Sequence, residues 1–239
     1  AVLREALMSI PAGGFSIEIG RVKKAGIDCC DFCVRLDAVH ENHDHDMAYL
    51  HGHEHTHGHE HTHGHEHTHD HEHTHEHEHT HSHGEAPHSH HEHRGMKEIR
   101  EILDACRMTE AARDVAYRIF KILAEAEAKA HQVPVEEVHF HEVGAVDSIV
   151  DVVAAAVCLD NLGITEVILP RLCEGRGTVR CQHGILPIPV PAVANIVSAC
   201  SIPLEWIDAE GEFVTPTGPA IAAAVRTSGR LPGTFRIER

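Results

Sequence analysis

A histidine-rich tract interrupts this chain and limits which parts of it can fold. Between His40 and His93 lie 24 of the 28 histidines and 12 of the 37 acidic residues, and residues 51–80 repeat HGHEHT with small changes. Such a tract has no apolar stripe to bury, so nothing offsets the entropy lost on ordering it. The sequence therefore predicts three parts: 1–39, the N-terminal part of a globular domain; 40–94, a disordered metal-binding insert; and 95–239, the main globular part.

The chemistry of the tract follows from its imidazoles. Neutral imidazoles at every second position can bind Ni²⁺, Cu²⁺, Zn²⁺ or Co²⁺, several ions per chain and with little selectivity. We interpret the tract as a metal reservoir. An expression tag is the alternative, but the tract is internal, long and imperfectly repeated. The histidines of the first repeats that we expect to bind metal are His51, His53, His55, His57, His59 and His61.

Charge and composition outside the tract exclude several classes of protein. There, 25 acidic residues face 20 basic ones, so the net charge is −5 against −17 for the whole chain, which leaves no basic field for nucleic acid. No apolar run reaches the ~18–20 residues of a membrane span, and the start has no signal-peptide layout. Eight scattered cysteines favour reduced thiols, so we expect a cytoplasmic protein. From the charge and the lack of a long apolar run we expect no nucleic-acid or membrane partner, and we leave a homo-oligomer open.

Hydrophobic periodicity predicts helices and short strands in alternation. This order favours an α/β or α+β fold in which a mixed sheet packs against helices, interrupted by the disordered insert. Thr109 is the expected N-cap of the longest helix, and Pro191 lies near the first turn of a later one. The expected strands are 15–19 and 26–36 as an antiparallel pair, 138–141 and 165–169; the expected helices are 1–10, 95–107, 109–130, 148–162, 192–199 and 220–226.

A single Cys-x-x-Cys occurs at Cys30 and Cys33, directly after Cys29. A structural zinc site needs a second pair at similar spacing, and the sequence has none. We interpret these residues as core or edge thiols and leave a transient role in nickel handling open.

The stretch Val138–Val152, VHFHEVGAVDSIVDV, puts two histidines and three carboxylates into an otherwise apolar run. On a strand, His139 and His141 would share one face because side chains alternate. Ser148-x-x-Asp151 has the form of a capping box, which predicts a helix starting at Ser148.

These polar residues predict a mixed metal or acid–base site. Asp147 and Asp151 would lie one turn apart on one helix face, opposite the strand end that carries His139, His141 and Glu142. Imidazole suits nickel, zinc, copper or iron, and carboxylates can complete the metal shell or accept protons. The alternative is that the histidines only form hydrogen bonds at the surface.

Two glycine-containing stretches could bind a ligand. Gly175 and Gly177 would let a ligand approach the backbone closely, and Arg176 could pair with a phosphate or thiocarboxylate. Thr215 and Thr217, before the last predicted helix, could hold a phosphate at its start. An ordinary turn and plain N-capping by Thr217 are the alternatives. The chain contains no G-x-x-x-x-G-K-[ST] P-loop.

Three motifs in register after a His-rich insert carry a family resemblance: HFHEVGAVDSIVDVV, EGRGTVRCQHGILPIPVPA and GEFVTPTGPAI. They resemble the nickel-insertion protein family of nickel-pincer cofactor synthesis (LarC), over most of residues 90–225 and more weakly over 1–40. The resemblance implies a lyase-class nickel chelatase that inserts Ni²⁺ into pyridinium-3,5-bisthiocarboxylic acid mononucleotide. The reaction is expected to use CTP with a divalent cation, and to supply lactate racemase or a similar apo-enzyme with its cofactor.

Two departures from the family pattern shape these expectations. The family's N-terminal FSGxSGDM-like segment and its CTP-associated C-terminal domain are not in this sequence, which also does not begin with Met. We therefore expect the CTP site to lie outside this chain and the complete reaction to need more than this chain.

Within this framework we expect His139 and His141 to be transient nickel ligands and Glu142 a base or additional ligand, with Asp147 and Asp151 as ligands or orienting groups. The cofactor-binding residues would be Gly175, Arg176, Gly177, Thr215 and Thr217. Two other classes stay open: a non-enzymatic nickel store or metallochaperone, and a cyclase- or hydrolase-like zinc enzyme.

Overall fold

The structure, a computed structural model, describes residues 2–12, 14–36, 94–140, 146–181 and 183–236. All of them belong to one compact unit that joins the residues before the His-rich tract to those after it. The tract itself, 40–93, lies outside the described residues, so its disorder and the domain boundary at 94 stay predictions.

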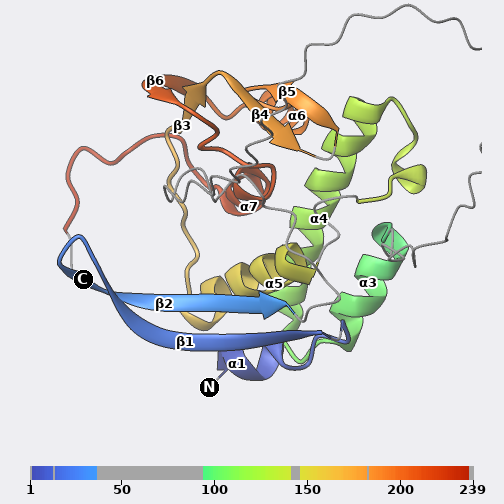
Figure 1. Cartoon of the computed structure of the whole chain (residues 1–239). Helices are drawn as coiled ribbons and strands as arrows, with labels where there is room; N and C mark the ends of the chain where they lie inside the picture. The colour runs from blue at the N-terminus through green and yellow to red at the C-terminus, as the bar shows by residue number, and fades with distance from the viewer. Residues whose placement is uncertain (1, 13, 37–93, 141–145, 182, 237–239) are drawn as a thin grey trace, which may run out of the picture. The chain divides into compact units, whose positions relative to one another are not determined.

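The long helix α4 (Glu110–His131) is the centre of the packing, as Figure 1 shows. Its N-cap is Thr109, whose Oγ1 accepts a hydrogen bond from the Ala112 amide at 3.1 Å, as predicted. Its apolar stripe is fully buried at Ile119, Phe120 and Leu123. The helices and helical turn that pack against α4 are α3 (Met96–Ala105), the 3₁₀ turn η1 (Val135–Glu137), α5 (Val146–Asn161), α6 (Pro191–Ala199) and α7 (Thr217–Val225). The short helix α1 (Val2–Leu7) packs against α5.

The first two strands form the predicted antiparallel hairpin, β1 (Phe15–Lys24) with β2 (Ile27–Leu36). Ala25 and Gly26 make its turn with positive φ at both positions, the geometry that matches the twist of the strands. Cys30 and Cys33 stand three residues apart on β2 and so point to opposite faces. They therefore cannot coordinate one metal ion together as a Cys-x-x-Cys pair.

The remaining strands build two further two-stranded sheets. β3 (Leu172–Arg176) pairs in parallel with β6 (Leu204–Glu210), and β4 (Thr178–Cys181) pairs antiparallel with β5 (Gly184–Pro187). Helix α6 begins at Pro191, one residue before the predicted start and with the proline in the first turn as expected, and it contributes Val193 to a small apolar cluster under these strands. The mixed helix-and-strand class is confirmed; the strands of the described residues form three small sheets.

At two segments that were predicted to be strands, the structure has only isolated β-bridges. Residues 138–141 were expected to pair as a strand, but within the described part only Phe140 does so, with Arg94. Residues 165–169 contribute one parallel bridge, Ile168 with Ser228. Each segment alternates in burial or composition like a strand, but a strand needs a neighbouring backbone along its whole length.

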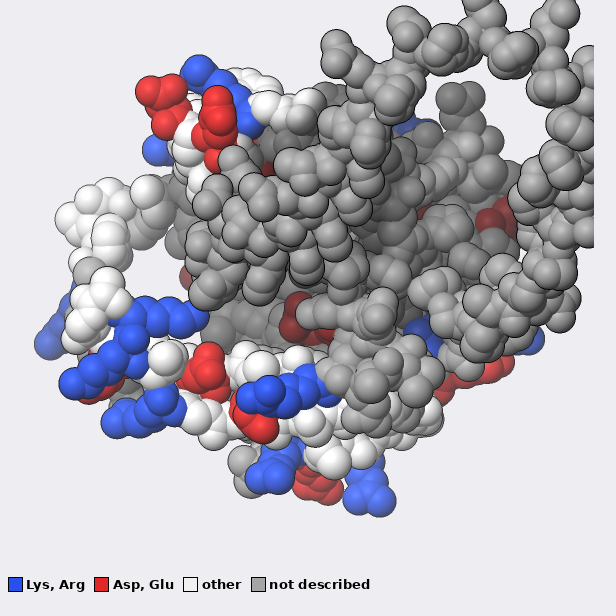
Figure 2. Space-filling view, viewed as in Figure 1, with Lys and Arg blue, Asp and Glu red and all other residues white. Residues whose placement is uncertain are grey.

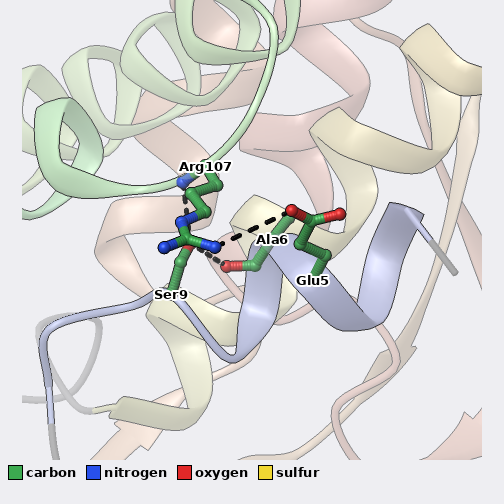
Figure 3. Close-up of polar contacts among 4 residues, drawn as sticks. All are labelled: Glu5, Ala6, Ser9 and Arg107. Carbon is green, nitrogen blue, oxygen red and sulfur yellow. Dashed lines mark hydrogen bonds and ion pairs between the residues drawn. The ribbon is translucent and has the colours of Figure 1, made fainter.

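The chain before the tract is tied to the chain after it at the junction drawn in Figure 3. Ser9 Oγ donates to the Ala6 carbonyl at 2.5 Å and accepts from the Arg107 amide at 2.7 Å. The Arg107 guanidinium also approaches Glu5 at 3.9 Å. Because these contacts join α1 to the end of α3, the described residues on the two sides of the tract belong to one folded body.

Figure 2 shows basic side chains gathered over the hairpin, where Arg21, Lys23 and Lys24 are exposed on β1. The described residues include no helix long and apolar enough to cross a membrane.

Candidate functional site

The first candidate region is the stretch 138–151. Val138 and Phe140 are buried at 3% and 2% exposure, whereas His139 is exposed, so the predicted alternation holds for these residues. Phe140 is fixed twice: its amide donates to the Arg94 carbonyl at 2.9 Å, and its ring packs edge-on against Phe120 at 6.1 Å. The first described residue after the tract is thus hydrogen-bonded to the segment that carries His139.

The start of α3 lies beside His139. Glu98 Oε2 accepts a hydrogen bond from the Gly95 amide at 2.9 Å and caps this helix. Backbone hydrogen bonds from Glu98 and Gly95 are the main cause that lowers the pKa of the Glu98 carboxyl, and the charge of His139 adds a smaller contribution. His139 therefore has an acidic neighbour that the sequence did not indicate.

Asp147 and Asp151 lie on the first turns of α5, on one face as predicted. The predicted helix start was wrong, because α5 begins at Val146 and Ser148 is already inside it. Ser148 instead donates its amide to Asp147 Oδ1 at 2.9 Å. Asp151 keeps solvent contact, but partial desolvation, with a smaller contribution from the charge of Asp147, raises its pKa above the usual aspartate value.

Replacing Asp151 with asparagine is expected to stabilise the chain at neutral pH and not at acid pH. Folding raises the pKa of this carboxyl, so its ionisation costs stability as pH rises through the unfolded value and then the folded value. The gain from Asp151→Asn should therefore grow from about pH 4 toward neutrality. Thermal unfolding at a series of pH values measures it, and an equal gain at acid and neutral pH would contradict the assignment.

The other two residues expected here, His141 and Glu142, lie outside the described residues. Among the residues that are described, no three His, Cys, Asp or Glu side chains already surround one metal position. Three of the five expected site residues, His139, Asp147 and Asp151, are thus placed, and their joint action stays a prediction.

The second candidate region is built on β3 and β6. Its least expected member is Glu174, the one buried charged residue of the described chain, at 0% exposure. Its Oε1 accepts from the Gly175 amide at 2.9 Å and from the Phe213 amide at 2.8 Å, which fastens β3 to the segment before α7. Its Oε2 is buried without a hydrogen-bond partner. The sequence signal was a lone carboxylate inside the strand-like run LCEGR, and it drew no prediction.

Gly175 is buried and packs against the 209–213 segment, where its lack of a Cβ makes room for backbone. Arg176 and Gly177 are exposed beside it. Together with Ile188 and Trp206 they line an open depression of about 370 Å³. Trp206 is 51% exposed. The guanidinium of Arg176, on β3, lies 3.6 Å from the carboxylate of Asp208, which follows Trp206 on β6. Acidic and basic side chains lie side by side over these strands in Figure 2.

Thr215 and Thr217 precede and begin α7. Thr217 is the first residue of the helix, and Pro216 stands at the N-cap without a side-chain hydrogen bond. N-capping by Thr217, the plain alternative for this motif, is therefore wrong. The Thr215 carbonyl accepts from the Gly218 amide at 3.0 Å, and the Thr215 side chain is exposed.

Comparisons with known proteins agree with these motifs. A protein of Alkaliphilus metalliredigens, described as a pyridinium-3,5-bisthiocarboxylic acid mononucleotide nickel insertion protein, is 46% identical over all 239 residues, which span 49% of its own length. Proteins with the same description are 41% identical in Acetivibrio thermocellus, over 61% of this chain and 36% of the relative, and 45% identical in Clostridium acetobutylicum, over 54% and 30%. No solved structure matches.

The chain spans about half the length, or less, of these curated relatives. The profile of the nickel insertion protein family matches residues 1–239, from the first residue to the last. The chain therefore belongs to the nickel insertion protein family.

Proposed function

We propose that this chain is the part of a nickel chelatase that binds nickel and the pyridinium mononucleotide named in its relatives. One observation carries the proposal: the only tryptophan of the sequence, Trp206, lines an open depression beside Arg176. An aromatic face attracts the cationic ring of a pyridinium mononucleotide, and an arginine pairs with its phosphate or thiocarboxylate. Trp206 and Arg176 supply both.

Nickel is the cargo of this reaction. His139 and His141 hold it as neutral imidazoles, and the softer sulfurs of the two thiocarboxylates draw it away. As the nickel–carbon bond forms, the ring C–H bond breaks and a carboxylate accepts the proton. Asp151 suits this role better than an ordinary aspartate because its raised pKa makes it a stronger base. Glu142 is the other candidate base, and Asp147 acts as an orienting group for the nickel-binding histidines.

The backbone around the depression holds the nucleotide. Gly177 has a φ of 107°, and nothing lies within 4 Å of the position that a Cβ would take, so a ligand can approach its backbone closely. The exposed Thr215 hydroxyl and the start of α7 at Thr217 form the phosphate end in this proposal. Gly175 contributes by positioning Arg176.

The wider reaction extends beyond this chain. CTP with a divalent cation is the expected co-substrate, and we assign its site to the part of the longer relatives that these residues do not span. Lactate racemase or a similar apo-enzyme would receive the product. All eight cysteines lie in the described part of the chain and none of them forms a disulfide there, which agrees with a reducing cytoplasm.

The sole tryptophan makes the nucleotide site directly measurable. Nicotinic acid mononucleotide, a pyridinium ribotide with one carboxylate, is expected to quench Trp206 fluorescence saturably because the ring stacks on the indole. Arg176→Ala should weaken the binding about tenfold or more, the loss of one charge-assisted hydrogen bond. A fluorescence titration gives both numbers.

Two controls make the titration decisive. Arg180→Ala removes an exposed arginine from the neighbouring strand β4 and should leave the binding unchanged. Ribose 5-phosphate has no pyridinium ring, so it should compete without quenching. Linear, unsaturable quenching, or equal losses in both arginine variants, would reject this placement of the nucleotide.

A further inference from the structure

Two elements far apart in the sequence bring four metal-ligating side chains together. Glu127 and His131 lie one turn apart at the end of α4, with His131 Nε2 3.5 Å from Glu127 Oε2. Cys181 ends β4 and His183 stands in the turn to β5, with Cys181 Sγ 4.0 Å from His183 Nδ1. The two pairs meet through their imidazoles, whose ring centroids are 5.0 Å apart.

These separations fit donors that share one ion. Zinc-like ions bind imidazole nitrogen at about 2.0–2.1 Å and thiolate sulfur at about 2.3 Å, so two donors on one tetrahedral ion stand about 3.4–3.6 Å apart. Two imidazoles bound in this way have ring centroids about 5 Å apart. The observed centroid separation of 5.0 Å equals that value, and both donor pairs lie within 0.5 Å of theirs.

The backbone holds these positions independently of any ion. His131 is the last residue of α4, which ends at Gln132 in the left-handed conformation. Cys181 is paired with Gly184 across the β4–β5 hairpin, and Gly184 has a φ of 95°, which glycine adopts without strain. The end of a helix also favours a cation, because its last carbonyls point toward it.

The four side chains do not yet surround a single point. His131 and His183 are both exposed at the surface, so a change in their side-chain angles leaves the buried core and the backbone in place. We propose that Glu127, His131, Cys181 and His183 close around one borderline-soft divalent ion, Ni²⁺ or Zn²⁺, as a second metal site. One thiolate and one carboxylate balance the double charge of the ion, and binding releases the thiol proton.

This inference does not depend on the proposed function, since it concerns metal binding alone. The proposed site contains Cys181, whereas residues 40–93 of the His-rich tract contain no cysteine. A thiolate-to-nickel charge-transfer band in the near ultraviolet can therefore not arise from the tract, even when the tract is loaded with nickel.

The test is a titration of the reduced full chain with NiCl₂ while this band is recorded. The band is expected in the native chain and should fall at least about tenfold in Cys181→Ser and in His183→Ala, because each removes a ligand. Cys173→Ser, which removes an exposed cysteine of β3, should keep the full band. Zn²⁺ added to the nickel-loaded chain should abolish the band if both ions use this site.

Circular dichroism and thermal unfolding of each variant exclude a folding defect as the cause of a lost band. No band in the native chain would overturn the inference. So would a band that survives Cys181→Ser but disappears in a Cys29→Ser/Cys33→Ser double variant, because the thiolate would then belong to the hairpin.

Discussion

Replacing Phe120 with alanine is expected to lower the free energy of unfolding by about 3–5 kcal/mol, the usual cost of removing a fully buried aromatic ring. Phe120 has 0% exposure and lies on the core stripe of α4. Its ring also contacts Phe140 edge-on, so the variant loses an aromatic pair together with buried apolar area. Urea unfolding followed by circular dichroism measures the change.

The Phe120→Ala variant should also loosen the first candidate region, at Phe140. Phe140 stands beside His139, and without Phe120 only the backbone bond to Arg94 holds it among the contacts described above. We expect increased hydrogen exchange at the Phe140 amide in Phe120→Ala beyond the global loss of stability. Phe213→Ala, which removes a ring that is 56% exposed, is the control and should change stability by less than about 1 kcal/mol. Equal effects of the two variants would show that Phe120 is not a core residue.

Replacing Gly175 with alanine is expected to cost about 3 kcal/mol, at the upper end for overpacking. An added Cβ would collide with the Gly211 carbonyl and lie 2.8 Å from Phe213 Cδ2 and 3.0 Å from the Ala209 carbonyl. Two of these obstacles are backbone atoms, which cannot rotate away. The β3–β6 pairing and the Glu174 hydrogen bond to Phe213 must therefore shift, and Arg176 shifts with them.

Gly218→Ala is the matched control for this prediction. Nothing lies within 4 Å of the position of its added Cβ, and Gly218 is inside α7, where alanine is favoured over glycine by about 1 kcal/mol. Thermal unfolding should therefore show a loss for Gly175→Ala and a small gain for Gly218→Ala. A neutral Gly175→Ala would mean that β3 and the 209–213 segment are not packed as described.

Local patterns predicted the elements whose signals are complete within a few residues. The hairpin 15–36, the helix capped by Thr109 and the helix starting at Pro191 all appear where alternation, capping and proline chemistry indicated. These signals act between neighbours in the chain, and so they can be read without knowing the rest of the fold.

Signals that depend on a distant partner failed or were incomplete. The segment at 138–140 alternates like a strand but, among the described residues, pairs only with the backbone of Arg94. One local signal failed as well: the capping-box form at Ser148 predicted the wrong helix start, since α5 begins at Val146. Glu174 drew no prediction from the sequence, because its partner, the Phe213 amide, is 39 residues away along the chain. The nearness of His131 to His183 was equally hidden, because 52 residues separate them in the sequence.

The sequence by itself determined that these helices and the first hairpin exist, although not every helix start, and it determined the family through three motifs in register. The histidine reservoir stays a prediction from the sequence. Burial of Glu174, the Arg176–Trp206 depression and the approach of Cys181 and His183 to the end of α4 were decided only by the tertiary structure. The reason is physical: periodicity and capping are interactions within a turn or a strand, whereas desolvation and ligand geometry arise when segments far apart along the chain are packed together.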